Sequence, residues 1–391
     1  MLPRTREDGR VRLRAEIRSP AISTRELWFE VDEPRAELTT SGAEPFVLVT
    51  LLLAMTERRA LRVVDAPVDP VLLRNLREFQ RVWESWFGYE TVDIDADVGN
   101  VGSKPADAVV AFSGGVDSAF SAWWHTRGAA CEERPVRSGM MMHGGDIPLA
   151  DRDGFDSAAA RSRRMTESLD LDLVTVATNA WSLPVPITHF TGLAVAGTLH
   201  VLGGGFGAGL LPSTATYRDL VVALNTSPVT DWMLGSSTFD VVHDGARYTR
   251  FEKLEHLCAW PEALAELRFC LDDPAHDRNC GICHKCMMTA AAFRILGIRP
   301  ACFDTMPVAD ELRAWARTLP SRPYYLQEGA ELVRAAVERG LDEPWVRTLD
   351  HRIRIAHAKQ GIRLAWPALA DTASSLHRRA RLLANERFRQ T

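Results

Sequence analysis

The sequence has no long apolar segment and no excess of positive charge. Its best apolar run, Phe46 to Met55, is far shorter than the ~18 to 20 residues that cross a bilayer, and it is typical of a buried helix. The formal net charge of −5 argues against general affinity for nucleic acid. The first residues also lack the apolar stretch of a secretory signal. We therefore expect a cytoplasmic protein that does not contact membranes.

The sequence also lacks the cysteine pattern of a disulfide framework. It has seven cysteines, an odd number, and four of them lie close together late in the chain. This usage favours a reducing compartment and a metal site. With 391 residues, 46% of them hydrophobic, the chain can form two domains or one large one.

A glycine-rich turn between an apolar strand and a helix is the most informative stretch. The β-branched run Val109 to Phe112 leads into Ser113 to Ser118, which reads SGGVDS, and an apolar helical segment follows. Adjacent glycines allow positive φ angles and a close approach of backbone to ligand. Two hydroxyls and the first N–H groups of the helix can then converge on an anion, which the helix dipole favours. We predict a phosphate-binding loop.

This loop lacks the Lys-Ser/Thr pair of a Walker A motif and has Val116 and Asp117 in its place. A carboxylate within a phosphate loop is expected where a divalent cation lies between it and the anion, so we predict that Asp117 binds Mg²⁺. SGGVDS resembles the signature of the PP-loop, or N-type, ATP pyrophosphatases. Members of that superfamily cleave ATP between the α- and β-phosphates and form an adenylated intermediate.

Two other interpretations of the loop compete with this one. The glycine pair could be a simple turn. Alternatively, Ala-Phe-Ser-Gly-Gly loosely matches the nucleophile elbow of a serine hydrolase, with Asp240 and His243 as partners. That scheme has Ala111 in place of the first glycine and assigns no role to Asp117 or Ser118.

The residues after the loop alternate between strands and helices, which predicts an α/β fold with a doubly wound, mainly parallel sheet. Strands are expected at Met140–Met142, Asp172–Val176, Ala208–Leu211 and Phe239–His243, and helices at Ala158–Leu169 and Thr191–Leu202. Ligands of such sheets bind beyond the carboxyl ends of the strands. The backbone from Met142 to Gly145 is therefore expected near an adenine, and Tyr217 to Asp219 are candidates for contact with a substrate.

Three regions are predicted: a small α/β module at residues 1–100, the core at 106–303 and a helical extension at 304–391. In the module, strands are expected at Val11–Ile17, Glu26–Val31 and Leu61–Val64, and helices at Pro45–Arg58 and Pro70–Phe87. Trp83 and Trp86 in the last helix could stack on a base, but their helical spacing is more typical of core. In the extension, helices are expected at Val308–Leu319, Gln327–Gly340, Glu343–Ala356 and Pro367–Phe388.

The loop carries no cation to balance the charge of a leaving pyrophosphate, so one must come from elsewhere. The Lys-x-Glu at Lys253 resembles the lysine-containing helix start of the superfamily; a solvated helical lysine is the alternative, and Arg250 is a weaker candidate. Lys253, Asp117 and Ser113 are the predicted catalytic residues. The predicted nucleotide contacts are Ser113, Gly114, Gly115, Val116, Asp117, Ser118, Met142 and Lys253.

A dense cluster of cysteines follows, with the spacing C-x9-C-x2-C-x2-C: Cys270, Cys280, Cys283 and Cys286. Four thiolates in such spacing are typical of a structural zinc site, whose metal binding is coupled to folding. His276 or His284 could replace one thiolate, and an iron–sulfur cluster is the main alternative.

The loop, the lysine helix and the cysteine cluster together resemble the 7-cyano-7-deazaguanine synthases over about Val109 to Phe303. Those enzymes carry a four-cysteine zinc site, adenylate a carboxylate on a deazapurine and use ammonia to form an amide and then a nitrile. The resemblance implies ATP, Mg²⁺ and Zn²⁺ as cofactors. Because long segments flank the shared region, we expect a different small-molecule substrate.

Two alternative functions stay open at this point. Sulfur transfer to a tRNA base would use the same adenylation and would need a reactive cysteine, for which Cys131 is the candidate. A non-catalytic nucleotide-binding module could instead recruit a partner through the basic stretch from His351 to Thr391. The sequence leaves the oligomeric state, including a homodimer, undecided.

Overall fold

The computed structural model describes residues 1–99, 102–129, 134–219, 224–270, 272–273 and 278–359. Contacts between residues group the chain into two compact units, Met1–Met306 and Pro307–Thr391. Among the described helices, none is both long and apolar enough to cross a membrane.

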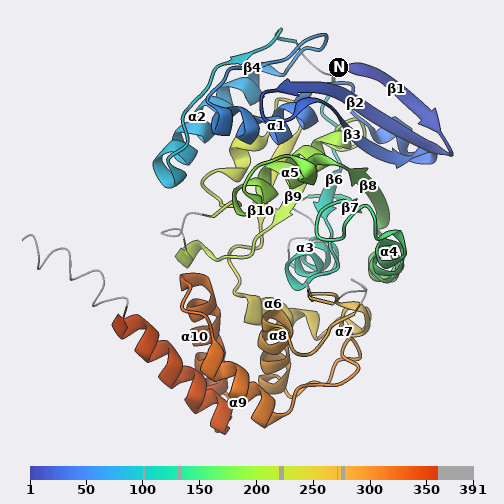
Figure 1. Ribbon diagram of the computed structural model, residues 1–391. Coiled ribbons are helices and arrows are strands. Elements are labelled where there is room, and N and C mark those ends of the chain that lie inside the picture. Colours follow the sequence, from blue (N-terminus) through green and yellow to red (C-terminus); the bar gives the residue numbers. More distant parts are fainter. Residues whose placement is uncertain (100–101, 130–133, 220–223, 271, 274–277, 360–391) are drawn as a thin grey trace, which may run out of the picture. The chain divides into compact units, whose positions relative to one another are not determined.

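An eight-stranded sheet forms the centre of the first unit (Figure 1). In spatial order its strands are β1 (Leu2–Glu7), β2 (Arg10–Ser19), β3 (Ser23–Asp32), β8 (Asp172–Thr178), β7 (Val136–His143), β6 (Ala108–Ala111), β9 (Ala208–Pro212) and β10 (Asp240–Asp244). All neighbours from β8 to β10 are parallel, whereas β1, β2 and β3 pair antiparallel and β3 joins β8 antiparallel. The predicted α/β fold with a mainly parallel sheet is confirmed.

The parallel strands follow a Rossmann-like order. The chain enters the parallel part of the sheet at β6, proceeds outward through β7 and β8, and then returns to the other side of β6 with β9 and β10. Val110 on β6 is accordingly in register with Gly139 on β7 and Leu210 on β9. Strand order reverses between β6 and β9, and a crevice beyond the carboxyl ends of the strands at such a point is where ligands of these sheets bind.

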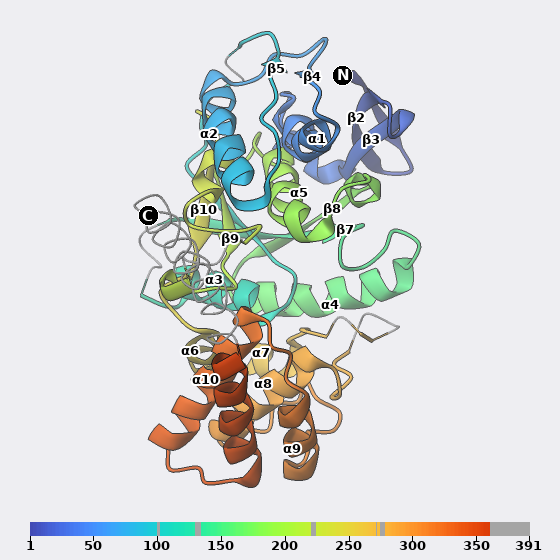
Figure 2. The same cartoon turned by 60° about the vertical axis from the view of Figure 1, so that its left-hand side comes forward.

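Helices cover both faces of the parallel strands (Figures 1 and 2). On one face lie α3 (Val116–Thr126) and α4 (Arg152–Ser168), which contact β6, β7, β8 and β9. On the other lies α5 (Ile187–Val201), with α1 (Glu44–Glu57) packed upon it. The apolar run within α1 is buried from Phe46 to Met55, as predicted.

The N-terminal residues differ from their predicted place as a separate module. Strand β3 pairs with β8 through Phe29 and Thr178, so residues 1–100 share the sheet of the core. One face of β3 buries Leu27, Phe29 and Val31 against the helical layer, where Phe29 meets Phe46 at 5.3 Å between ring centroids. The pairing also covers an edge of β8 that would otherwise leave backbone groups exposed. A second, two-stranded sheet joins β4 (Leu61–Arg62) and β5 (Ile94–Asp95).

Helix α2 (Pro70–Phe87) has the predicted bounds and forms an aromatic core. Asp69 caps it by accepting hydrogen bonds from the backbone N–H groups of Val71 and Leu72. Trp83 is fully buried and stacks on Phe79 at 4.1 Å, which confirms its predicted core role.

The other α-helices among the described residues of the first unit are α6 (Arg250–Leu257), α7 (Pro261–Glu266) and α8 (His284–Ile295). The second unit contains α9 (Ala309–Thr318), α10 (Pro323–Glu338) and a helix at residues 344–359. These three match predicted helices. The predicted helix Pro367–Phe388 and most of the basic stretch lie outside the described residues.

Candidate functional site

A cavity of about 370 Å³ lies beyond the carboxyl ends of β6 and β9, at the reversal of strand order. Its volume is in the range of small-molecule sites, about 300 to 1,000 Å³. The glycine-rich loop forms one wall, and the apolar wall includes Met140, Met141, Met142, Ile147, Trp181 and Val195. Polar groups line the rest: Asp146, Thr191, Thr214, Asn225, Thr226, Arg250, Arg268 and Lys285. Met142 thus lies where the sequence predicts a ligand contact.

The loop from Ser113 to Ser118 is held by its own hydroxyl groups. The Ser118 hydroxyl accepts from the Ser113 N–H at 3.2 Å and donates to the Gly115 carbonyl at 3.0 Å. The Ser113 Oγ lies 3.3 Å from the Ser118 Oγ and accepts from the Gly115 N–H at 3.3 Å. Helix α3 begins right after Gly115, which provides no side-chain cap for the first turn. This geometry directs a helix N-terminus at the cavity and favours an anion there.

Gly114 requires its glycine, because its φ is +74° and an added Cβ would lie 3.0 Å from the Ser162 Oγ. Gly297 has nearly the same φ, +70°, but nothing lies within 4 Å of an added Cβ. We expect both alanine variants to lose about 1 to 3 kcal/mol of stability through backbone strain. Only Gly114→Ala should also weaken pyrophosphate binding. Urea denaturation and calorimetric titration measure the two effects, and equal pyrophosphate affinity in both variants would contradict a ligand-binding role of the loop.

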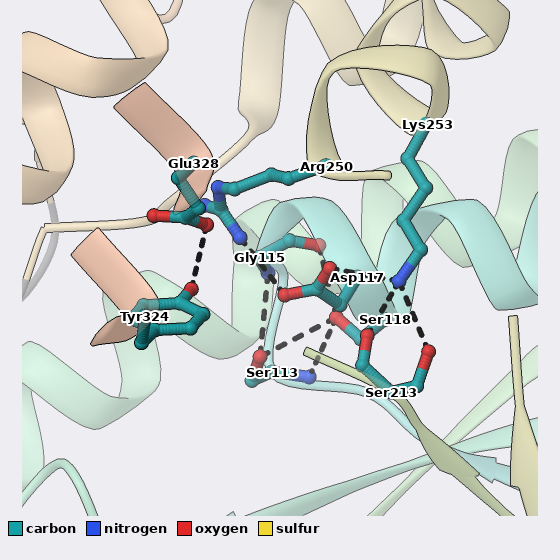
Figure 3. A network of polar contacts seen from close by, with 9 residues as sticks. All are labelled: Ser113, Gly115, Asp117, Ser118, Ser213, Arg250, Lys253, Tyr324 and Glu328. Atoms are coloured by element: carbon teal, nitrogen blue, oxygen red, sulfur yellow. Dashed lines mark hydrogen bonds and ion pairs between the residues drawn. The ribbon is translucent and has the colours of Figure 1, made fainter. Parts of the chain in front are cut away.

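Asp117 is the centre of a largely buried charge network, in which the side chains of Asp117 and Arg250 keep some exposure to the cavity (Figure 3). Its Oδ2 accepts from the Arg250 Nη1 at 2.8 Å, and its Oδ1 accepts from the Lys253 Nζ at 3.1 Å. Burial alone would raise the pKa of Asp117, but the charges of Lys253 and Arg250 outweigh burial and hold this pKa below its ordinary value. The two cations are one helical turn apart on α6, whose first turn is fixed by a capping box between Thr249 and Glu252.

Lys253 lies behind Asp117 instead of on the cavity wall. Its side chain is 1% exposed, and its Nζ also donates to the carbonyl and the hydroxyl of Ser213, just after β9. The predicted lysine and aspartate are therefore in contact. Of the two cations beside Asp117, however, it is Arg250 that lines the cavity. The sequence favours Lys253 because Lys-x-Glu resembles the lysine-containing helix start of the superfamily, and such a resemblance does not reveal which cation is covered.

Two cations on the cavity wall were not predicted. Arg268 is 6% exposed, and burial lowers its pKa. Its backbone N–H donates to the Gly114 carbonyl at 2.8 Å, and its Nη2 donates to the Ser113 carbonyl at 3.4 Å. Lys285 lies in the first turn of α8, between two of the clustered cysteines. The only signal in the sequence is that both residues are close to the cysteines.

The four predicted cysteines come together, and their sulfur atoms all lie within 4.8 Å of one another: Cys270, Cys280, Cys283 and Cys286. Two of the sulfur pairs, Cys270–Cys283 and Cys280–Cys286, are 3.8 Å apart. A tetrahedral zinc ion with Zn–S bonds of about 2.3 Å places its sulfurs about 3.8 Å apart, so the cluster could bind one such metal ion. A multi-iron cluster distributes its cysteines over different irons and spaces them more widely. Cys270 also lines the cavity.

The serine-hydrolase alternative finds no triad in the described residues. His243 pairs with Asp231, at 2.7 Å, and Asp240 contacts Lys104 at 2.6 Å.

The predicted substrate contact Tyr217 is 54% exposed and does not line the cavity. Cys131 and His276 lie outside the described residues.

No family model, curated protein or solved structure matches this chain.

Proposed function

We propose that this chain is an ATP-dependent, AMP-forming enzyme of the PP-loop type. It would transfer the adenylyl group of ATP to an oxygen of a small molecule, a carboxylate, and release pyrophosphate. Ammonia or another nitrogen nucleophile would then displace AMP. The observation that supports this most directly is the SGGVDS loop at the reversal of strand order, facing a cavity that Arg250, Arg268 and Lys285 line.

The charges of the cavity fit an anion of high charge. Three cations and the two carboxylates of Asp117 and Asp146 line the cavity, and Lys253 lies directly behind Asp117. Fixed cations and N–H groups that are already in position stabilise negative charge as it develops on a leaving pyrophosphate. In this assignment Ser113 and the first turn of α3 contact the phosphates, while Lys253 positions Asp117 and Arg250. The methionine-rich wall from Met140 to Met142 would receive the base.

Asp117 fits less well as a ligand of Mg²⁺, because both of its carboxylate oxygens already accept hydrogen bonds from cations. A magnesium ion at this carboxylate would have to share its oxygens with Arg250 and Lys253 or displace one of these cations. Its binding by Asp117 stays a prediction, and no step of the proposed reaction depends on it. The cysteine cluster would hold Zn²⁺ in a structural role, since four thiolates leave no open position for a substrate.

Product analysis of ATP turnover in the presence of a small-metabolite extract tests the proposal. We expect AMP and pyrophosphate from the wild-type protein and at least about 100-fold less from Arg250→Ala, because losing one preorganised donor typically has an effect of this size. Arg127→Ala is the matched control, since Arg127 is 45% exposed and pairs with Asp170 away from the cavity. Formation of ADP and phosphate, or turnover only when RNA is added, would contradict the proposal and favour the alternatives.

A further inference from the structure

We propose that the cysteine cluster positions two of the cavity cations, Arg268 and Lys285, so that metal binding and phosphate binding are energetically coupled. The inference rests on the proposed function, because it assumes that the cavity binds phosphate. It assigns to the metal site a role in ligand affinity in addition to its expected role in folding.

The first connection runs along the chain from Cys270 to the phosphate loop. Arg268 precedes this cysteine by two residues, and its backbone N–H and guanidinium donate to the Gly114 and Ser113 carbonyls. The segment 267–270 therefore lies directly against the phosphate loop. A metal ion that holds the Cys270 sulfur would hold this segment, and with it the contacts of Arg268 to the loop backbone.

Two segments of the chain, the two arms of the cluster, supply its cysteines: one carries Cys270 and the other carries Cys280, Cys283 and Cys286. The buried side chain of Asn279 joins these two arms. Its Oδ1 accepts from the backbone N–H groups of Phe269 at 3.0 Å and Cys270 at 3.3 Å. Its Nδ2 donates to the Leu267 carbonyl at 2.8 Å and the Cys302 carbonyl at 2.9 Å. Asn279 is next to Cys280 in the sequence, so one amide fixes the arm of Cys270 to the arm that carries the other three cysteines.

The second connection runs through the start of α8. The Cys283 sulfur caps this helix by accepting from the Cys286 N–H at 3.4 Å, and Lys285 lies between these two cysteines. Lys285 and Cys270 both line the cavity, so the cluster borders the proposed phosphate site itself. A metal ion on Cys283 and Cys286 would fix the turn that presents Lys285 to the cavity.

Without a metal ion, four thiol groups at these distances have no common partner to hold them together, and the two arms keep the Asn279 amide as a link but lose the one through the metal. Arg268 is the more sensitive cation, because a buried guanidinium keeps its place only while its partners stay in position. Coupling between two ligands is reciprocal, so pyrophosphate should strengthen metal binding by the same factor by which the metal strengthens pyrophosphate binding.

Calorimetric titration of the full-length protein with pyrophosphate tests this inference. We expect at least about tenfold weaker binding after a zinc-selective chelator has removed the metal, and recovery when one equivalent of Zn²⁺ is added. Metal content is measured by mass spectrometry and folding by circular dichroism. A metal-free protein that stays folded and binds pyrophosphate with unchanged affinity would overturn the inference.

A variant covers the case in which the metal-free protein unfolds. Asn279→Ala removes the amide that joins the two arms but no cysteine, and we expect it to retain one equivalent of metal while pyrophosphate binding weakens several-fold. Arg278→Ala is the matched control, because Arg278 is 65% exposed and lies beside Asn279 but does not line the cavity. Unchanged affinity in metal-loaded Asn279→Ala would also overturn the inference. If the zinc-loaded wild type binds neither pyrophosphate nor ATP, the proposed function fails and the inference fails with it.

Discussion

Asp117→Ala is expected to destabilise the protein by about 3 to 5 kcal/mol, the usual effect of removing one partner from a buried ion pair. The variant leaves Lys253, which is 1% exposed, with only Ser213 as a described polar partner. Arg250 loses its contact to the carboxylate as well. The same variant should form no AMP, because the two cations are no longer held beside the loop. Urea denaturation at neutral pH measures the loss of stability.

A double variant separates the charge effect from a simple loss of packing. If the uncompensated charge of Lys253 causes the loss, Asp117→Ala combined with Lys253→Met should recover part of the stability. Asp170→Ala provides the surface control, since Asp170 is 84% exposed in its pair with Arg127 and should contribute less than about 1 kcal/mol. An Asp117→Ala variant as stable as Asp170→Ala would show that the buried network does not stabilise the fold.

The same carboxylate predicts a pH dependence. The folded-state pKa of Asp117 lies below its ordinary value of 3.8, because the attraction of Lys253 and Arg250 outweighs the effect of burial. A carboxyl group with a lowered pKa contributes stability that is complete above its unfolded-state pKa and is lost as the pH falls through the folded-state pKa. The difference in stability between wild type and Asp117→Asn should therefore shrink as the pH falls from about 5 towards 3. A constant difference over this range would contradict the lowered pKa.

Trp83→Ala is expected to destabilise the protein by about 3 to 5 kcal/mol, the range for removing a large aromatic side chain from a core. Trp83 is fully buried, stacks on Phe79 and lies 5.3 Å from the ring of Phe87. All three residues lie on α2, and Trp83 also belongs to the buried hydrophobic core of the first unit, so its truncation would leave a large cavity there. Chemical denaturation followed by circular dichroism measures the effect.

Two further variants test the cause of this effect. Trp86 is only half-buried, so Trp86→Ala should lose clearly less stability. Trp83→Phe should also be mild, because it keeps a ring and removes a buried indole N–H that has no hydrogen-bond partner among the described residues. If Trp83→Phe were as damaging as Trp83→Ala, ring packing would not be the main contribution of this residue.

Local patterns in the sequence determined the elements and the local sites. The helical period of apolar residues over Pro70–Phe87 predicts α2 to the residue, because burial of one helix face imposes that period. The glycine pair predicts the turn before α3, and the spacing of the cysteines predicts their convergence, since only two residues separate each of the last three cysteines from the next. These features depend on residues that are close together in the chain.

The tertiary structure decided which distant groups meet. Pairing of β3 with β8 joins residues about 150 positions apart, and no local period indicates that the N-terminal strands extend the core sheet. Contacts between residues that are far apart in the sequence also cover Lys253 with Asp117 and Ser213. They likewise place the backbone N–H of Arg268 at the carbonyl of Gly114. Backbone pairing between strands and the burial of a charge depend on the whole packed fold. The sequence therefore predicted the loop and offered Lys253 and Arg250 as candidate cations. Which of them reaches the cavity, and the presence of Arg268 and Lys285 beside it, became evident only from the packing of segments that follow the loop by 130 residues or more.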